Sequence, residues 1–303
     1  MKRIVILVLI VGFTAGALWW SQTQKAKTTV GPQTLMTAVA TGQRELTRIP
    51  MSATRLSDEE EINIGDSLAS RYTAYFSTAN PVEREEQIKM GEYIAIVGRN
   101  VSARAYRKLP YKFHYIPDVN FINAFALPGG HVFMGKGLML LMDSEDELAA
   151  VLGHEVEHID HYHCAERIQI EARLRHIPLS GLIELPFSLF QAGYTKDQEM
   201  EADSDGERLA VWAGYSPQGA VHMFEAFAKL ERGDTHPAKN PQQEVSRIAL
   251  QSLSEYFRSH PRAEDRIRNI QDLISKENWP PKPERDLQLI PSAKVIKKEM
   301  DNP

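Results

Sequence analysis

The distribution of hydrophobic and polar residues divides the chain into successive parts. Residues 4–20 are almost entirely apolar and follow Lys2 and Arg3, as in a secretion signal peptide or an N-terminal membrane anchor. Residues 21–56 are polar and broken by glycine and proline, which predicts a linker. Residues 57–276 show helical and strand-like periodicities and are expected to fold, whereas residues 277–303 are rich in proline and charge and are expected to form a loosely packed tail.

The apolar segment fits both a cleaved signal and a retained anchor. Ala15, Gly16 and Ala17 resemble a cleavage site, whereas residues 4–20 would reach about 25 Å as a helix, against roughly 30 Å of bilayer hydrocarbon. The cleavage-site pattern favours removal. In both cases the early positive charges keep the N-terminus in the cytoplasm and direct the rest of the chain across the membrane.

Several stretches of the folded part have the 3.6-residue periodicity of helices. Ser57 and Glu60 form a capping box at the start of the first, and Ser144 and Glu147 form another at the start of the third. Helices are expected over residues 57–76, about 83–105, 143–174 as one long helix, and 195–214, where Gly214 ends the helix. A further helix is expected to have Pro261 in its first turn.

Strand-like runs lie between the second and third of these helices. Residues 111–117 form one run, and residues 121–142 contain two more that are joined through Pro128, Gly129 and Gly130, which predicts a hairpin. An extended peptide can add to the edge of such a sheet through backbone hydrogen bonds, and the stretch that would receive it is Asn123, Ala124, Phe125 and Ala126. The alternative is ordinary core β-structure.

Charge and cysteine content exclude some partners. The net charge is −5 and basic residues are scattered among acidic ones, so nucleic acid is not expected to bind. A single cysteine excludes an internal disulfide and a multi-cysteine zinc site. Cys164 is expected to be a small buried residue in preference to a nucleophile or a ligand.

The HEVEH motif at residues 154–158 contains the main candidate metal ligands and catalytic residues. On one helix, His154 and His158 lie about 40° apart and one turn along the same face, which suits two imidazole ligands of one metal ion. His163 would point away from them, and His161 would lie roughly 10 Å from His154 along the axis, so neither is expected to be a ligand. The alternative is that the histidines merely cover a polar face.

A third ligand is available on the helix 195–214. Glu199 and Asp203 are spaced i, i+4 on one face, and a carboxylate beside two histidines completes the ligand set of many catalytic zinc sites. Asp203 would then accept the N–H of a ligand imidazole. The alternative is a solvated acidic face, because Glu201 and Asp205 lie close by.

Four motifs together resemble the gluzincin metallopeptidases of the CAAX prenyl protease and HtpX family, which includes soluble exported proteases. In chain order the motifs are NAFALPGG, HEVEH, EMEAD and SHP followed by Arg266, and the resemblance covers about residues 57–276. It implies an α+β zincin fold, mostly helical with a small sheet beside the HExxH helix. The exported branch fits best, because the transmembrane bundle of the prenyl protease branch is absent, and prenylated substrates are therefore not expected.

The same resemblance implies roles for individual residues. His154, His158 and Glu199 would bind one Zn²⁺ per chain, Glu155 would be the general base, and Asp203 would orient a ligand. His260 and Arg266 would face the substrate or its oxyanion. Spacing alone leaves Glu157 open as the base, and His260 taken alone is typical of a surface residue beside a helix cap.

The expected function is a zinc-dependent endopeptidase of the cell envelope that acts on unfolded or misassembled proteins. It would be periplasmic, or anchored to the membrane through an uncleaved N-terminal segment with its catalytic domain outside the cytoplasm. One alternative is a zinc-binding chaperone or adaptor whose proteolysis is latent or blocked, and another is a hydrolase of small peptides or amides. The apolar segment 176–194 is expected to be core, with a lid over the cleft as the alternative.

Overall fold

The structure is a computed structural model, and it describes residues 56–176, 181, 188–191, 193–231, 262–289, 294, 297 and 298. All of these lie in the compact unit Ala53–Pro303. The predictions for residues 1–20, for the linker and for His260 therefore fall outside the described residues, as do those for most of the segment 176–194. In the described part of the chain, no helix combines the length and the apolar composition that a membrane crossing requires.

The described elements form an α+β fold that is mostly helical, which confirms the predicted fold class. The strands are β1 (Lys112–Ile116), β2 (Ala124–Leu127) and β3 (His131–Gly135), with a short 3-10 turn η1 (Pro128–Gly130) between the last two. The helices are α3 (Asp58–Tyr75), α4 (Pro81–Ser102), α5 (Lys136–Met139), α6 (Glu145–Asp160), α7 (His163–Arg175), α8 (Ser188–Gln191), α9 (Lys196–Trp212), α10 (Gly219–Glu231) and α12 (Ala263–Glu277).

Side-chain caps begin three of the helices at the predicted places. The side chain of Ser57 accepts a hydrogen bond from the backbone N–H of Glu60, and the Glu60 carboxylate accepts one in return from the backbone of Ser57. Thr195 and Gln198 form the same reciprocal pair at the start of α9. At α6, Ser144 caps the helix as predicted, but the Glu147 carboxylate instead accepts from the backbone N–H of Asp143.

The three strands form one mixed sheet in the order β1, β3, β2. The predicted hairpin is confirmed, since β2 pairs antiparallel with β3 and Phe125 lies opposite Phe133. Gly129 and Gly130 turn the chain with φ angles of 77° and 112°, a region that favours glycine. Strand β1 pairs parallel with β3 and leaves β2 at the other edge of the sheet.

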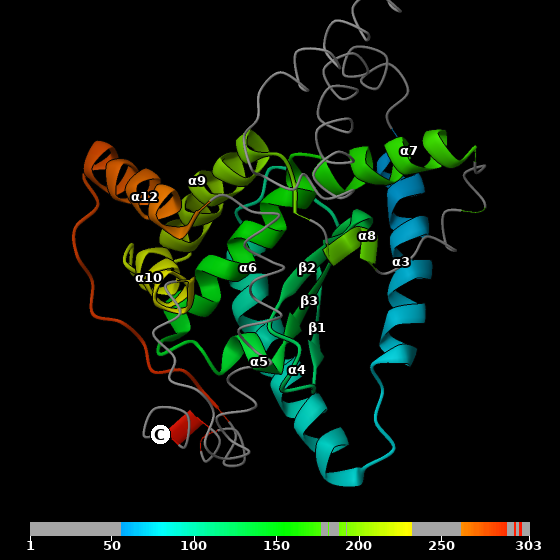
Figure 1. Ribbon diagram of the computed structural model, residues 1–303, viewed down its shortest axis with the longest axis horizontal. Helices are drawn as coiled ribbons and strands as arrows, with labels where there is room; N and C mark the ends of the chain where they lie inside the picture. Colours follow the sequence, from blue (N-terminus) through cyan, green and yellow to red (C-terminus); the bar gives the residue numbers. More distant parts are fainter. Residues whose placement is uncertain are drawn as a thin grey trace, which may run out of the picture. The chain divides into compact units, whose positions relative to one another are not determined.

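Helix α6 lies between the sheet and the remaining helices. It contacts β2 and β3 on one side and α9 and α10 on the other, and α12 packs on both α9 and α10 (Figure 1). The main hydrophobic core fills the space around α6 with residues from α4, α9 and α10, including Leu148, Leu152 and Val156 of α6 itself. This helix is therefore buried on nearly all sides, which fixes the groups that it carries.

The predicted helix 143–174 is interrupted, and the prediction of one continuous helix is wrong. Helix α6 ends at Asp160, Tyr162 adopts a left-handed conformation with φ 61°, and α7 starts at His163. The Asp160 carboxylate accepts the backbone N–H of Arg107, whose guanidinium donates to the Ile159 carbonyl and stacks 3.7 Å from the Tyr162 ring centre. Because this clamp comes from a distant segment, the local sequence does not reveal the break.

Two predictions near the C-terminus also need correction. Helix α12 has Arg262 at its N-cap, so Pro261 precedes the helix and does not belong to its first turn. The start of the tail is largely exposed, as expected, but it is attached: the Asp146 carboxylate accepts the Arg285 N–H, the Arg285 carbonyl accepts the Glu145 N–H, and Asp286 bridges to Ser144. The bond from the Glu145 N–H satisfies one of the N–H groups that a helix start leaves without an intrahelical partner.

Two buried side chains bear on the remaining structural predictions. Cys164 is buried with its Sγ 3.3 Å from the Tyr194 hydroxyl, and burial raises the pKa of its thiol to about 12, so the prediction of a buried inert residue is confirmed. In the segment 176–194, Phe190 is buried beside Tyr72 in a small second core. This part of the segment is core, as expected.

Candidate metal centre and active site

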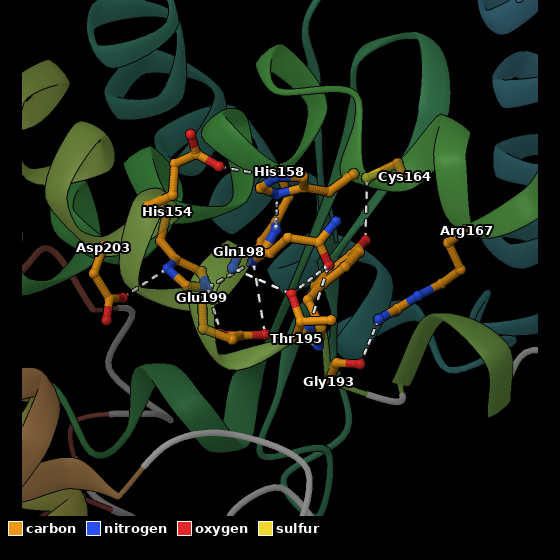
Figure 2. A network of polar contacts seen from close by, with 12 residues as sticks. His154, His158, Cys164, Arg167, Gly193, Thr195, Gln198, Glu199 and Asp203 are labelled. Carbon is orange, nitrogen blue, oxygen red and sulfur yellow. Dashed lines mark hydrogen bonds and ion pairs between the residues drawn. The ribbon is translucent and has the colours of Figure 1, made fainter. Parts of the chain in front are cut away.

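Two helices bring the predicted ligand side chains to one point. The Nε2 atoms of His154 and His158, both on α6, lie 3.0 Å apart. The Glu199 carboxylate of α9 approaches them, with one oxygen 3.5 Å from His154 Nε2 and the other 3.9 Å from His158 Nε2 (Figure 2). All three residues are buried.

A pair of glycines allows the two helices to come this close. A Cβ atom on Gly153 would lie 2.4 Å from the Gly206 carbonyl oxygen, and one on Gly206 would lie 2.5 Å from the His154 nitrogen. Real Cβ atoms do not approach other atoms so closely, and both positions therefore require glycine. The backbones of α6 and α9 touch beside His154, which puts Glu199 within reach of both histidines.

Asp203 and Arg266 fix the His154 ring. The Nδ1 atom of His154 lies 2.9 Å from the Asp203 carboxylate, which also accepts two hydrogen bonds from the Arg266 guanidinium of α12. With Nδ1 donating to Asp203, the neutral ring that a metal ion requires has its lone pair on Nε2, the atom that faces Glu199 and His158. Arg266 keeps the pKa of Asp203 low despite burial, so the carboxylate stays ionised.

A different set of contacts fixes the His158 ring. The ring stacks on Tyr194 with centres 3.9 Å apart, and the Nδ1 atom lies 3.0 Å from Nδ1 of His163. The backbone N–H of Tyr194 donates to the Glu199 carboxylate at 2.8 Å. Arg167 covers the other face of Tyr194, 3.5 Å from its ring centre, and Figure 2 shows it reaching the Gly193 carbonyl.

His163 does not lie where the sequence placed it. A continuous helix would turn its side chain away from His154, but the break at Tyr162 brings it against His158. Its Nε2 atom lies 3.4 Å from the Glu201 carboxylate. His163 therefore contacts a predicted ligand side chain but is not itself one of the three ligands. The expectation that its side chain points away from the site was wrong, because the helix is not continuous.

The three side chains fit a divalent metal ion. A tetrahedral zinc ion with bonds of about 2.0–2.2 Å holds its ligand atoms roughly 3.3 Å apart, close to the 3.0, 3.5 and 3.9 Å separations found here. Burial holds the pKa of His158 well below its ordinary value, so its ring is neutral, as metal binding requires. Burial also acts to lower the pKa of His154, but Asp203 and Glu199 outweigh it and raise that pKa to about 9, which indicates a site that favours positive charge.

Glu155 lies beside this centre. It lines the same pocket as His154, Asp203 and Arg266, and burial raises the pKa of its carboxyl to about 7. A carboxyl with a pKa near neutral can both accept and return a proton at physiological pH. Glu157, the alternative base, instead accepts from His161 at 3.1 Å and does not line this pocket.

His161 forms a separate polar cluster. Its Nε2 atom lies 2.9 Å from the Asp205 carboxylate and 3.1 Å from the Glu157 carboxylate. His161 was expected to lie near the predicted ligands without being one of them, and this is confirmed. Asp205 also pairs with Arg208, a cation that competes with any metal ion for its carboxylate. The His161 cluster therefore fits a metal ion less well than the centre around His154.

The proposed substrate strand runs past the centre. Asn123 and Ala124 line the pocket together with His154 and Glu155, and Ala124 to Leu127 form β2 at the sheet edge. The Asn123 carbonyl accepts a hydrogen bond from the Gly135 N–H of β3 at 3.0 Å. The geometry thus places Asn123 and Ala124 beside the candidate catalytic groups, whereas Phe125 packs in the second core and the peptide-binding role of the stretch stays a prediction.

Comparison with known proteins places these residues in a family context. The model of peptidase family M48 matches residues 88–274, which include every candidate site residue named above. The metalloprotease LoiP of Escherichia coli is 26% identical over 236 residues, which cover 73% of this chain and 83% of that protein.

Two further relatives are longer than this chain. The beta-barrel assembly-enhancing protease of Yersinia pestis is 28% identical over 203 residues, covering 60% of this chain and 40% of that protein. The mitochondrial metalloendopeptidase OMA1 of Schizosaccharomyces pombe is 29% identical over 196 residues, covering 59% of this chain and 51% of that protein. The chain thus spans about half or less of the length of these two relatives.

Proposed function

The chain belongs to peptidase family M48 and carries the metallopeptidase domain of that family, and we propose that this domain is a zinc-dependent endopeptidase. The observation that supports zinc most directly is the convergence of His154, His158 and Glu199, all buried, at one point. Two imidazoles and one carboxylate leave a fourth position for water at a catalytic zinc ion.

The proposed chemistry divides between the ion and the protein. A zinc ion bound by the three side chains would polarise the scissile carbonyl and lower the pKa of the attacking water. Glu155 accepts the proton from that water as its oxygen bonds to the carbonyl carbon. Glu155 then delivers the proton to the amine nitrogen as the peptide bond breaks.

Arg266 acts in this proposal mainly through Asp203. Both of its hydrogen bonds to Asp203 are made by a side chain that is only 3% exposed, and the guanidinium also lies 3.4 Å from His154 Nδ1. These contacts support a positioning role for Arg266 in the orientation of His154. Stabilisation of the oxyanion by Arg266, and by His260, remains the expectation drawn from the sequence.

The proposed substrates are unfolded or misassembled proteins of the cell envelope. An extended backbone would add to the edge of β2 at Asn123 to Ala126, a mode of binding that does not depend on side-chain sequence. Export is supported by the apolar segment 4–20 after Lys2 and Arg3. One relative is named a beta-barrel assembly-enhancing protease, which agrees with an envelope role.

The proposal is tested by proteolysis of a denatured protein. Wild type is expected to cleave it, a chelator to stop cleavage, and added zinc to restore it, while Glu155→Gln is expected to bind zinc and cleave nothing. Wild-type rates in Glu155→Gln would rule out Glu155 as the base. A folded, zinc-loaded wild type that binds denatured protein without cleaving it would favour the chaperone alternative.

A further inference from the structure

The pocket beside Glu155 is also lined by residues that have no role in the chemistry described so far. Most of these residues are apolar, and they include Ala150 and Val151 of α6 and Met223, Phe224 and Phe227 of α10, with the Arg266 guanidinium 4.2 Å from the Phe224 ring centre. Such walls suit the methylene groups of a side chain that enters from the catalytic centre.

One polar group interrupts this apolar wall. Glu207 of α9 lines the pocket, is 1% exposed, and neither of its carboxylate oxygens has a hydrogen-bond partner. Nearly all buried polar groups in proteins are hydrogen-bonded, and an unsatisfied one indicates a strained or functional site. Since Glu207 is one turn beyond Asp203 on α9, it lies about 6 Å further along the helix, roughly the reach of an unbranched four-carbon side chain.

The surrounding charges favour a cation at Glu207. Burial, followed by the negative charges of Asp203 and Asp146, raises the pKa of Glu207 well above its ordinary value, and a bound cation would stabilise the ionised carboxylate. Asp146 is held by the backbone N–H groups of Ser216 and Arg285, and no side-chain cation neutralises it in the described contacts. Arg266, the cation that lines the pocket, is already neutralised by two hydrogen bonds to Asp203.

We propose that this pocket binds the substrate side chain next to the scissile bond and that Glu207 selects lysine or arginine there. The inference rests on the proposed peptidase function and adds its substrate class. The side chain's methylene groups would lie against Met223, Phe224 and Phe227, and its charged end would donate hydrogen bonds to the Glu207 carboxylate. A cation supplies the partner that a buried carboxylate otherwise lacks.

The test compares the cleavage products of a denatured protein by mass spectrometry for wild type, Glu207→Gln and Glu207→Leu. Wild type is expected to show lysine and arginine enriched at one fixed position beside the cleaved bond. In both variants this enrichment is expected to be at least tenfold lower, while other sites are still cleaved. Glu225→Gln is the matched control, because Glu225 is an exposed acid on α10 and its loss should leave the profile unchanged. Identical profiles in wild type and the Glu207 variants would overturn the proposal, as would a wild-type profile without basic residues.

A second measurement separates this proposal from the peptidase assignment. If wild type cleaves nothing, thermal unfolding with n-butylamine and with its neutral analogue n-butanol still reports on the pocket. The amine is expected to raise the melting temperature of wild type more than the alcohol does, and to lose this advantage in Glu207→Leu. Equal shifts in wild type and Glu207→Leu would contradict a cation site at Glu207.

Discussion

Gly153 and Gly206 are in backbone contact, and this contact sets the distance between the helix that carries the two histidines and the helix that carries Glu199. Gly153 directly precedes His154. The separation of the predicted ligand atoms therefore depends on two residues that have no side chain and take no part in binding.

Replacing Gly206 with alanine tests this dependence. The new Cβ would lie 2.5 Å from the His154 backbone nitrogen, so α6 and α9 must move apart. We expect stability to fall by about 1–3 kcal/mol, the usual range for overpacking. We also expect zinc affinity to fall at least tenfold, as measured by competition with a chelator.

Gly91→Ala is the control for this variant, because a Cβ at Gly91 of α4 has nothing within 4 Å. It should raise stability slightly, by up to about 1 kcal/mol, since alanine favours helices. Unchanged zinc affinity in Gly206→Ala would show that the helix separation does not control the metal site.

His163→Ala tests the contact between the two imidazoles. Without the His163 Nδ1 atom at 3.0 Å, the ring of His158 loses a hydrogen bond that fixes its orientation. Groups that orient ligand side chains typically change metal affinity by about 10- to 100-fold, and we expect a loss in that range by chelator competition.

His161→Ala is the matched control, because His161 bonds Asp205 and Glu157 instead of a predicted ligand. We expect its zinc affinity to stay within about threefold of wild type, below the range for groups that orient ligands. Equal losses in the two variants would mean that the His158–His163 contact has no specific effect.

Arg266→Lys tests the positioning of Asp203. Lysine keeps the charge but cannot donate the two parallel hydrogen bonds that Arg266 makes to the carboxylate. We expect weaker zinc binding and slower proteolysis, with stability lower by about 1–3 kcal/mol. Arg268→Lys is the control, since Arg268 is 67% exposed and pairs only at the surface with Asp265. If both variants keep wild-type zinc affinity, Arg266 does not position the site.

His114 should make the protein sensitive to acid. Burial, followed by the charges of His131 and Lys112, lowers the pKa of His114 from 6.5 to about 4. The unfolded chain therefore binds more protons than the folded protein between these values, so stability should fall as the pH drops from 6.5 towards 4. The loss should reach at most about 3 kcal/mol.

Replacing His114 with phenylalanine should reduce this slope, while His131, whose pKa burial also lowers, still contributes to it. The ring of His114 already stacks on Phe133 with centres 4.4 Å apart, so an aromatic ring fits there. Urea unfolding at pH 7 and pH 5 measures the effect, and a wild-type slope in His114→Phe would assign the acid sensitivity to other groups.

Local sequence was sufficient for features that depend on nearby residues. The caps at Ser57 and Ser144, the hairpin at Gly129 and Gly130, and the common face of His154 and His158 all follow from short-range geometry. Glu199 was added by resemblance, because spacing alone could not distinguish a ligand from a solvated acidic face.

Features set by distant contacts could not be predicted in this way. The break at Tyr162 depends on Arg107, more than fifty residues earlier in the chain, and it reversed the expected direction of His163. The unpartnered carboxylate of Glu207 and the attachment of the tail to Asp146 likewise depend on how helices pack. The local signs of the close contact between α6 and α9 were two glycines inside helical stretches, Gly153 directly before the HEVEH motif and Gly206 on α9.

The central claim is that His154, His158 and Glu199 hold one zinc ion, and anomalous diffraction at the zinc edge tests it most directly. In crystals of the protein supplied with zinc, we predict one strong peak per chain about 2.0–2.2 Å from His154 Nε2, His158 Nε2 and a Glu199 oxygen. A peak located instead among Glu157, His161 and Asp205, or no peak at all, would contradict the account.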